Sequence, residues 1–231
     1  MIDVNDSANT SESNMTYNFD TLKQYQREVR DTFTDNLGIR VHRALSWLKR
    51  AEQCEDDDSR FIFLWIAFNA AYGCDIHDDK RFSERNLHHH FIKRICKMDD
   101  KNLLYDLVWD EFSGSIRLFL DNRYIYQPFW EFKRGNLDEV DWILRIARAT
   151  VRARKALVNQ DTGKVLAIIF NRLYTLRNQL IHGGATWDSK LNRNQVRDGA
   201  NILGKIVPVI IHLMMLHPDQ YWGAPSYPVA A

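Results

Sequence analysis

Apolar residues recur at intervals of three and four along most of this chain, which is the spacing of one face of an α-helix. The first such stretch runs from Phe19 to Gln53, and Asp20 or Thr21 is suited to cap its start. The sequence Asn36-Leu37-Gly38 is expected to divide this stretch in two. The pattern therefore predicts one or two helices before an acidic turn at residues 55–59.

Residues 60–72 are apolar on almost every side, and the acidic residues before them suit the N-terminus of a helix. A buried parallel strand is the alternative, but the length of the segment and its alanines favour a helix that ends near Gly73. Such a helix belongs at the centre of the molecule. Asn69 is the one amide in it and needs a hydrogen-bond partner, so we expect Asn69 to support a site.

The rest of the chain shows further helical patterns separated by polar breaks. Pro128 interrupts the aromatic segment 124–132, which is expected to be a loop or a short turn. Pro208 is expected to kink the last helix or shift its boundary. The predicted helices cover Ser83–Met98, Lys101–Leu120, Asn136–Val158, a segment capped by Asp161, and a segment from Asn192 or Asn194 to Leu216.

No long stretch alternates with a period of two, and no Asn-Gly or Asp-Gly turn joins β-branched runs. We therefore predict an all-α protein, a single bundle of six to eight helices over residues 17–216. The polar residues 1–16 are expected to be a disordered tail. Residues 217–231 are expected to form an extended, proline-containing tail.

The composition is that of a soluble protein with nearly balanced charge. The formal net charge is +1, so binding to nucleic acid would need a local basic patch. No apolar run reaches the length of a bilayer span, and the three cysteines contain no Cys-x-x-Cys pair. The sequence thus predicts a cytoplasmic protein with reduced thiols and no association with a membrane.

The richest candidate chemistry lies where an apolar helix meets a pair of glycines. Arg177, Asn178 and His182 precede Gly183-Gly184, which offer a helix stop because glycine tolerates positive φ. Asn178 and His182 share a face of an ideal helix, whereas Arg177 and His182 lie roughly 140° apart. The Arg and His converge only if the last turn unwinds or a second subunit completes the site.

A second match to the same spacing occurs at Arg85-Asn86-x3-His90. It lies near the start of a predicted helix in a polar stretch, where a solvated helix face explains it. His77 and residues 88–90, with Cys74 or Asp78, fit no closed zinc site, so we expect no metal and no cofactor. Of the two matches we favour the 177–182 site, because it lies at the end of an apolar helix beside two glycines.

The segment Arg177-Asn178-x3-His182-Gly183 resembles the Arg-x4-6-His motif of the HEPN superfamily. The segment Trp65-Ile66-Ala67-Phe68-Asn69-Ala70-Ala71-Tyr72-Gly73 is similar to the second signature of its Apea-like branch. The two together are more specific than either alone, and the resemblance covers about residues 40–216 as an all-α, HEPN-like domain.

The resemblance implies a metal-independent endoribonuclease, often the toxin of a toxin–antitoxin system or an effector of phage defence. It implies a homodimer in which both motifs line one cleft, an RNA substrate, and an antitoxin or sensor protein as a further partner. Arg177, Asn178 and His182 would be catalytic. Inactive members of the superfamily serve as scaffolds or ligand-binding modules, so an RNA- or nucleotide-binding module is the alternative function.

The residues themselves suit this chemistry. RNA carries its own nucleophile, the 2′-OH, and cleavage needs a base for that proton and an acid for the leaving oxygen. Histidine titrates near neutral pH, and the arginine fork matches phosphate oxygens. The competing explanation is a helix cap, because cations near a helix C-terminus interact favourably with its carbonyls and dipole.

A basic face and an aromatic run are the candidate RNA contacts. Arg145, Arg148, Arg152 and Lys155 recur at helical spacing and, with Lys190 beyond the motif, could follow phosphates. A solvated face that pairs with acids elsewhere is the more ordinary explanation of these residues. The aromatic run is more typical of a core or dimer surface than of base stacking. Arg172, Arg193 and Arg197 also flank the motif, and Arg154 lies among the basic residues.

Overall fold

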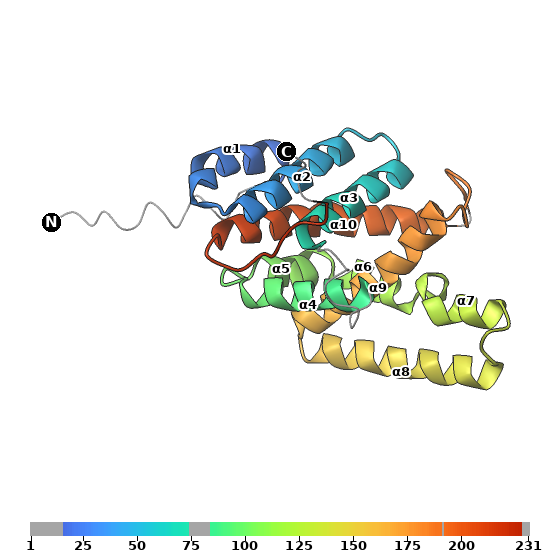
Figure 1. The fold of residues 1–231 in the computed structure, drawn as a ribbon. Coiled ribbons are helices and arrows are strands. Elements are labelled where there is room, and N and C mark those ends of the chain that lie inside the picture. Colours follow the sequence, from blue (N-terminus) through green and yellow to red (C-terminus); the bar gives the residue numbers. More distant parts are fainter. Residues whose placement is uncertain (1–15, 74–83, 191, 228–231) are drawn as a thin grey trace.

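The computed structural model describes residues 16–73, 84–190 and 192–227. Within these ranges the chain forms ten α-helices and no strand, so the all-α prediction is confirmed, although the helices are shorter and more numerous than expected. Helices α1, α2 and α3 form one layer, α10 runs beneath it, and α4, α5, α6 and α9 lie below α10 (Figure 1). Helices α7 and α8 form the outer edge on that side. The predicted disorder of residues 1–16 falls almost wholly outside the described residues.

The N-terminal layer begins with α1 (Phe19–Val29), the short turn η1 (Arg30–Thr32) and α2 (Asp35–Glu52). Asn18 caps α1 through Thr21, so the predicted caps were wrong by a few residues. The predicted break at Asn36–Gly38 was also misplaced. The chain breaks at Phe33, and the Thr34 side chain then caps α2 by accepting from the Leu37 N–H, which leaves Gly38 inside the helix.

Helices α3 (Asp57–Tyr72) and α10 (Arg193–Leu216) occupy the centre of the molecule and pack against each other. Asp56 caps α3, and the helix ends at Gly73 as predicted. Pro208 is buried within α10, which continues past it. By length and composition α10 could span a membrane, contrary to our expectation for the sequence, but most of its apolar stretch is buried in this bundle.

The predicted helix Lys101–Leu120 is divided. Helix α4 (Glu84–Lys97) is followed by α5 (Leu103–Asp106), a π-turn η3 (Leu107–Glu111) and α6 (Ser113–Asp121). The π-turn moves the chain off the helical register, so Phe112 leaves α-geometry and α6 starts anew. The apolar positions of the predicted face are nevertheless buried or packed against the core.

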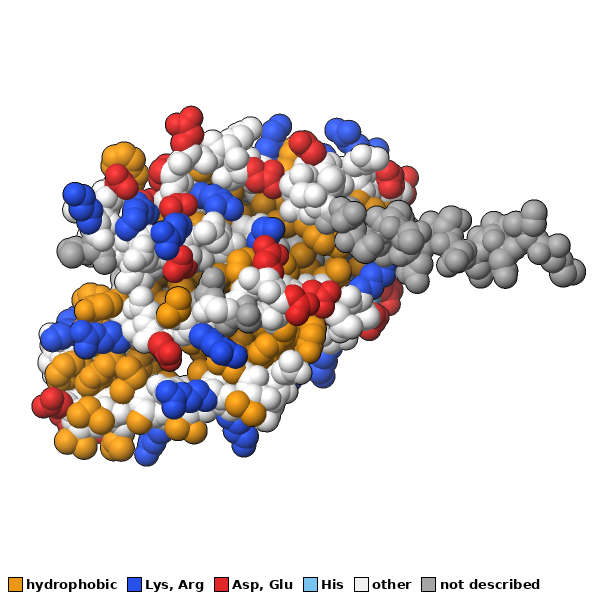
Figure 2. Space-filling view, turned by 180° about the vertical axis from the view of Figure 1, so that it is seen from behind, with side chains coloured by type: hydrophobic (Ala, Val, Ile, Leu, Met, Phe, Trp, Pro, Cys, Tyr) orange, Lys and Arg blue, Asp and Glu red, His pale blue; other side chains and the backbone are white. Residues whose placement is uncertain are grey.

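The aromatic segment predicted to be a loop is largely helical. It forms η4 (Arg123–Ile125) and α7 (Gln127–Lys133), with Pro128 in the first turn of α7. Proline is favoured there because the N–H groups of a first turn have no partner within the helix. Helix α8 (Glu139–Val158) follows, capped by Asp138 rather than by Asn136. Figure 2 shows hydrophobic side chains gathered over the α7–α8 edge, where Val140, Ile143 and Leu144 of α8 are exposed.

Arg40 ties the segment after α10 to the N-terminal layer. The residues from His217 to Tyr227 are not helical, and Trp222 is buried against the bundle. The buried guanidinium of Arg40 donates to Ala71 O at 3.1 Å and Gly73 O at 2.7 Å. It also donates to Gly223 O at 3.3 Å and Ala224 O at 2.8 Å. One side chain of α2 thereby fixes the end of α3 and the C-terminal segment together.

Candidate functional site

Helix α9 (Thr162–Ile181) carries the predicted motif. The Asp161 side chain caps it as predicted, by accepting from the Lys164 N–H at 3.0 Å. Ile169, Leu173 and Leu176 face the core and are fully buried. This inner face fixes the rotation of α9 about its axis, so its polar positions are directed outward at the end of the helix.

The last turn of α9 stays helical. The His182 N–H still donates to Asn178 O at 3.1 Å, and the chain turns only at Gly183, whose φ is +67°. Gly184 comes close to the helix, because a Cβ there would lie 3.1 Å from Gln179 O. The turn does not unwind, so the backbone leaves Arg177 and His182 of one protomer on different faces.

The side chains lessen this separation. Arg177 Nη1 donates to Asn178 Oδ1 at 3.0 Å, which turns the guanidinium toward the face that bears His182. The guanidinium also lies 5.9 Å from the centre of the Tyr174 ring. Arg177 Nε is buried and has no hydrogen-bond partner among the described residues. The imidazole of His182 is exposed, so this end of α9 is open to a second molecule.

A polar stripe runs along α9 toward His182. Asn171, Thr175, Asn178 and His182 follow one another at steps of four, three and four, which places them on one face of the helix. Thr175 donates its hydroxyl to Asn171 O at 3.2 Å. This stripe is the sequence signal that could have extended the predicted site toward the start of α9.

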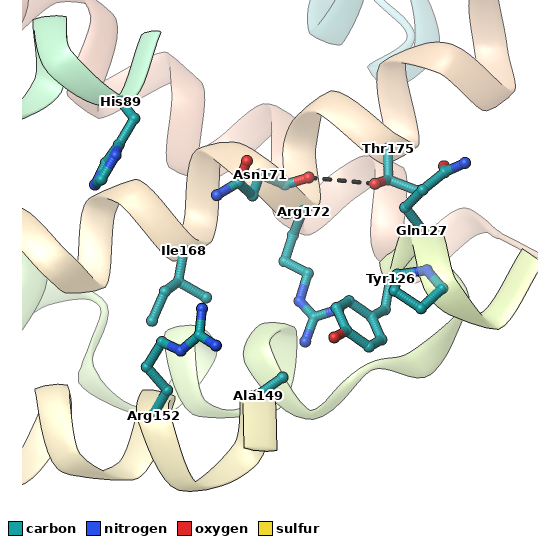
Figure 3. A pocket seen from close by; sticks show the side chains of 10 residues that line it. His89, Tyr126, Gln127, Ala149, Arg152, Ile168, Asn171, Arg172 and Thr175 are labelled. Carbon is teal, nitrogen blue, oxygen red and sulfur yellow. Dashed lines mark hydrogen bonds between the residues drawn. The ribbon is translucent and has the colours of Figure 1, made fainter. Parts of the chain in front are cut away.

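A pocket of about 370 Å³ lies beside this stripe, between α9, α8 and the start of α7 (Figure 3). Arg172 projects into it from α9 and Arg152 from α8, as the close view shows. Its lining consists of His89, Tyr126, Gln127, Pro128, Ala149, Arg152, Ile168, Asn171, Arg172 and Thr175. Sequence reasoning named the two arginines separately, but it did not foresee that three distant segments would bring them together.

Arg172 is the most unusual residue of the pocket. Its side chain is buried, its guanidinium lies 4.0 Å from the centre of the Tyr126 ring, and Nη2 donates to Leu120 O at 3.3 Å. Nη1 is buried without a hydrogen-bond partner among the described residues. Desolvation lowers the pKa of Arg172 to about 10, against smaller opposing effects of Tyr126 and Asp121. Within the described part of the chain, no carboxylate forms an ion pair with this guanidinium.

The basic face of α8 is only partly gathered around this pocket. All four predicted residues are exposed, but Arg145 lies 3.5 Å from Glu131, which is the acid pairing that we considered as the alternative. Of the four, Arg152 alone lines the pocket. Arg148 and Lys155 lie on the same helix without contributing to the lining.

Two of the three basic residues beyond α9 that were candidates for phosphate contacts are paired with acids instead. Lys190 is exposed. Arg193 bridges Asp58 at 2.7 Å and Asp188 at 2.8 Å, so it fastens the loop after α9 to α3. Arg197 is paired with the neighbouring Asp198 at 3.2 Å. These two arginines stabilise the loop and the start of α10, which leaves less positive charge around the motif than the sequence suggested.

The second match, Arg85–His90, is not assembled as a copy of the first. His88 is buried and His90 is exposed, whereas the side chains of Arg85 and Asn86 lie outside the described residues. His89 lines the pocket. Cys74, His77 and Asp78 also lie outside the described residues. No group of three metal-ligating side chains occurs in the part of the chain that the structure describes.

Asn69 and the aromatic run were the remaining candidates for supporting or contacting a ligand. Asn69 is half-buried, and its Oδ1 is enclosed without a hydrogen-bond partner among the described residues, so the expected partner is not found there. Phe129 is buried, and Phe132 stacks on Trp142 of α8 at 6.2 Å between ring centres. Phe129 and Phe132 thus join α7 to α8, whereas Tyr124 of the same run stays exposed.

Comparison with known proteins gives no relative. No family model, curated protein or solved structure matches this chain. The proposed function is therefore supported by the residues and their geometry alone.

Proposed function

We propose that this protein is a metal-independent endoribonuclease whose site is completed by a second copy of the chain. The observation that carries the proposal is the exposed His182, one turn beyond an Asn178 that accepts a hydrogen bond from Arg177. The exposed imidazole supplies one of the two proton-transfer groups that cleavage by an internal hydroxyl requires, and the oriented guanidinium supplies a cation for the phosphate.

The proposed reaction transfers the phosphate within the RNA. One imidazole removes the proton of the 2′-OH, and the oxygen attacks the adjacent phosphorus. The bond to O5′ breaks, and a second imidazole gives O5′ a proton. Arg177 stabilises the negative charge on the phosphorane oxygens. The products are a 2′,3′-cyclic phosphate and a 5′-hydroxyl, with no water or metal consumed.

A second protomer would supply the second imidazole. His182 is the one histidine in the polar stripe of α9, and a two-fold axis beside it would pair it with its copy. Ile181 and Trp187, at the same end of α9, are 46% and 74% exposed and give such a contact apolar area to bury. We propose a cytoplasmic toxin or defence effector, held in check by an antitoxin or sensor protein.

The test is cleavage of single-stranded RNA by purified protein in the presence of EDTA. We expect cleavage that ends in cyclic phosphates, no cleavage of a strand with 2′-deoxynucleotides, and a loss of at least about a hundredfold in rate with His182→Ala. His90→Ala is the matched control, because it removes an exposed histidine of the second match and should keep full activity. Equal cleavage by the His182→Ala protein would refute the proposal.

Binding without cleavage is the second candidate function. The last turn of α9 does not unwind, so one protomer alone presents a single imidazole on the motif face. A chain that stays monomeric would then use Arg177 and Asn178 only to hold RNA or a nucleotide. RNA binding that yields no products and is lost with Arg177→Ala would favour this function over catalysis.

A further inference from the structure

We propose that the pocket between α9, α8 and α7 binds the phosphate group of a nucleotide-sized ligand. This site is separate from the motif at the end of α9, and the proposal does not depend on ribonuclease activity. The charge, the unpaired donors and the shape of the pocket support this assignment.

Arg172 provides the first argument. Arg172 is 7% exposed, and its guanidinium donates to one backbone carbonyl, while Nη1 has no acceptor among the described residues. Burying a cation without a partner anion is costly, and guanidinium keeps its proton at physiological pH. An anion in the pocket, which Arg172 lines, would offset the burial of the charge.

The lining of the pocket provides the second argument. Arg152 approaches from the facing helix α8, and His89 lies on the α4 side, as Figure 3 shows. No Asp or Glu is among the described residues that line it, although Asp121 is near enough to influence Arg172. Two guanidiniums from opposite walls are suited to the several oxygens of one phosphate, since each can donate two hydrogen bonds.

Size and polarity indicate an organic phosphate rather than a bare ion. A volume of about 370 Å³ is within the range of small-molecule sites, and an inorganic ion would leave most of it filled with water. Ile168, Ala149 and Pro128 give an apolar wall for a sugar or base. Asn171 and Gln127 add amide groups that can bond ring nitrogens or hydroxyls.

The experiment measures binding by calorimetry on the full chain carrying His182→Ala, which keeps RNA probes intact. The probes are AMP, adenosine and inorganic phosphate, followed by a short RNA with either a 5′-phosphate or a 5′-hydroxyl. We expect AMP to bind more tightly than phosphate and adenosine to bind at least about tenfold more weakly than AMP. A preference for the phosphorylated RNA over AMP would identify an RNA end as the source of the phosphate.

Two variants assign the binding to this pocket. Arg152→Ala should weaken AMP binding roughly tenfold or more, and Arg172→Met should abolish it. Arg148→Ala is the control, because it removes the same charge from the same exposed helix without touching the lining, and its affinity should change less than about twofold. Equal losses with Arg152→Ala and Arg148→Ala, or equal binding of AMP and adenosine, would overturn the proposal.

Discussion

Arg172 is the residue whose burial we expect to oppose the stability of the fold. A buried cation whose pKa is lowered by desolvation stays charged only at a free-energy cost, and the ring of Tyr126 and one carbonyl compensate for part of it. A residue that lowers the stability of its own fold needs a gain elsewhere. The proposed phosphate ligand would provide that gain.

Arg172→Met should therefore raise the free energy of unfolding in phosphate-free buffer, by about 1 to 3 kcal/mol. The folded pKa near 10 lies below the ordinary value of 12.5, so the cost is fully present below pH 10. It declines only as the pH rises above 10, because the unfolded chain then binds more protons than the folded one. Urea unfolding at pH 7.5 measures the effect. A variant less stable than the parent would show that Arg172 stabilises the fold.

At the scale of single elements, helix caps decide where the segments begin. Asp161 accepts hydrogen bonds from the backbone and the side chain of Lys164, and the side-chain bond is the larger cause of its lowered pKa. This cap starts the helix that carries both the polar stripe and Arg172.

Asp161→Ala should lower stability by about 1 kcal/mol at neutral pH, because an N–H of the first turn loses its acceptor. Because the pKa of Asp161 is lowered in the folded state, its contribution to stability is fully present above the unfolded pKa of 3.8. This contribution is lost as the pH falls below 3.8 and through the folded pKa. The difference between parent and variant should accordingly shrink in acid. Asp161→Asn keeps an acceptor and should retain most of the stability at pH 7, measured by thermal unfolding. An unchanged difference at pH 3 would exclude the carboxylate as the cause.

Apolar periodicity was sufficient to predict α3, α8, α9 and α10 from the sequence. The cap of α9 and the end of α3 were also predicted, whereas the cap of α8 was not. The prediction was wrong where short-range geometry decides, at the π-turn before Phe112 and at Pro128. The motif on α9 was visible because its residues are neighbours in sequence. The pocket was not, because Arg152, Tyr126 and Arg172 meet only after α7, α8 and α9 have packed.

At the scale of the whole molecule, Arg40 joins parts that are far apart in sequence. Arg40→Met should lower the free energy of unfolding by about 2 to 4 kcal/mol, because four buried or half-buried carbonyls lose a charged donor. It should also release the segment after α10, so limited proteolysis should cut between residues 217 and 227. Arg50→Met, on the exposed face of the same helix, should behave like the parent. An Arg40→Met protein that resists the protease equally would show that Trp222 alone holds the segment.

Gly199 sets how closely α10 can approach its neighbours. A Cβ at this position would lie 3.0 Å from Phe61 Cε2, and 3.2 Å from the Cδ2 atoms of Leu173 and Leu176. The absence of a side chain at Gly199 thus allows α10 to pack closely against α3 and against the second half of α9. A side chain added there would have to push Leu173 and Leu176 of α9 aside, so the packing behind Arg177 and His182 depends on an atom buried on the opposite side of their own helix.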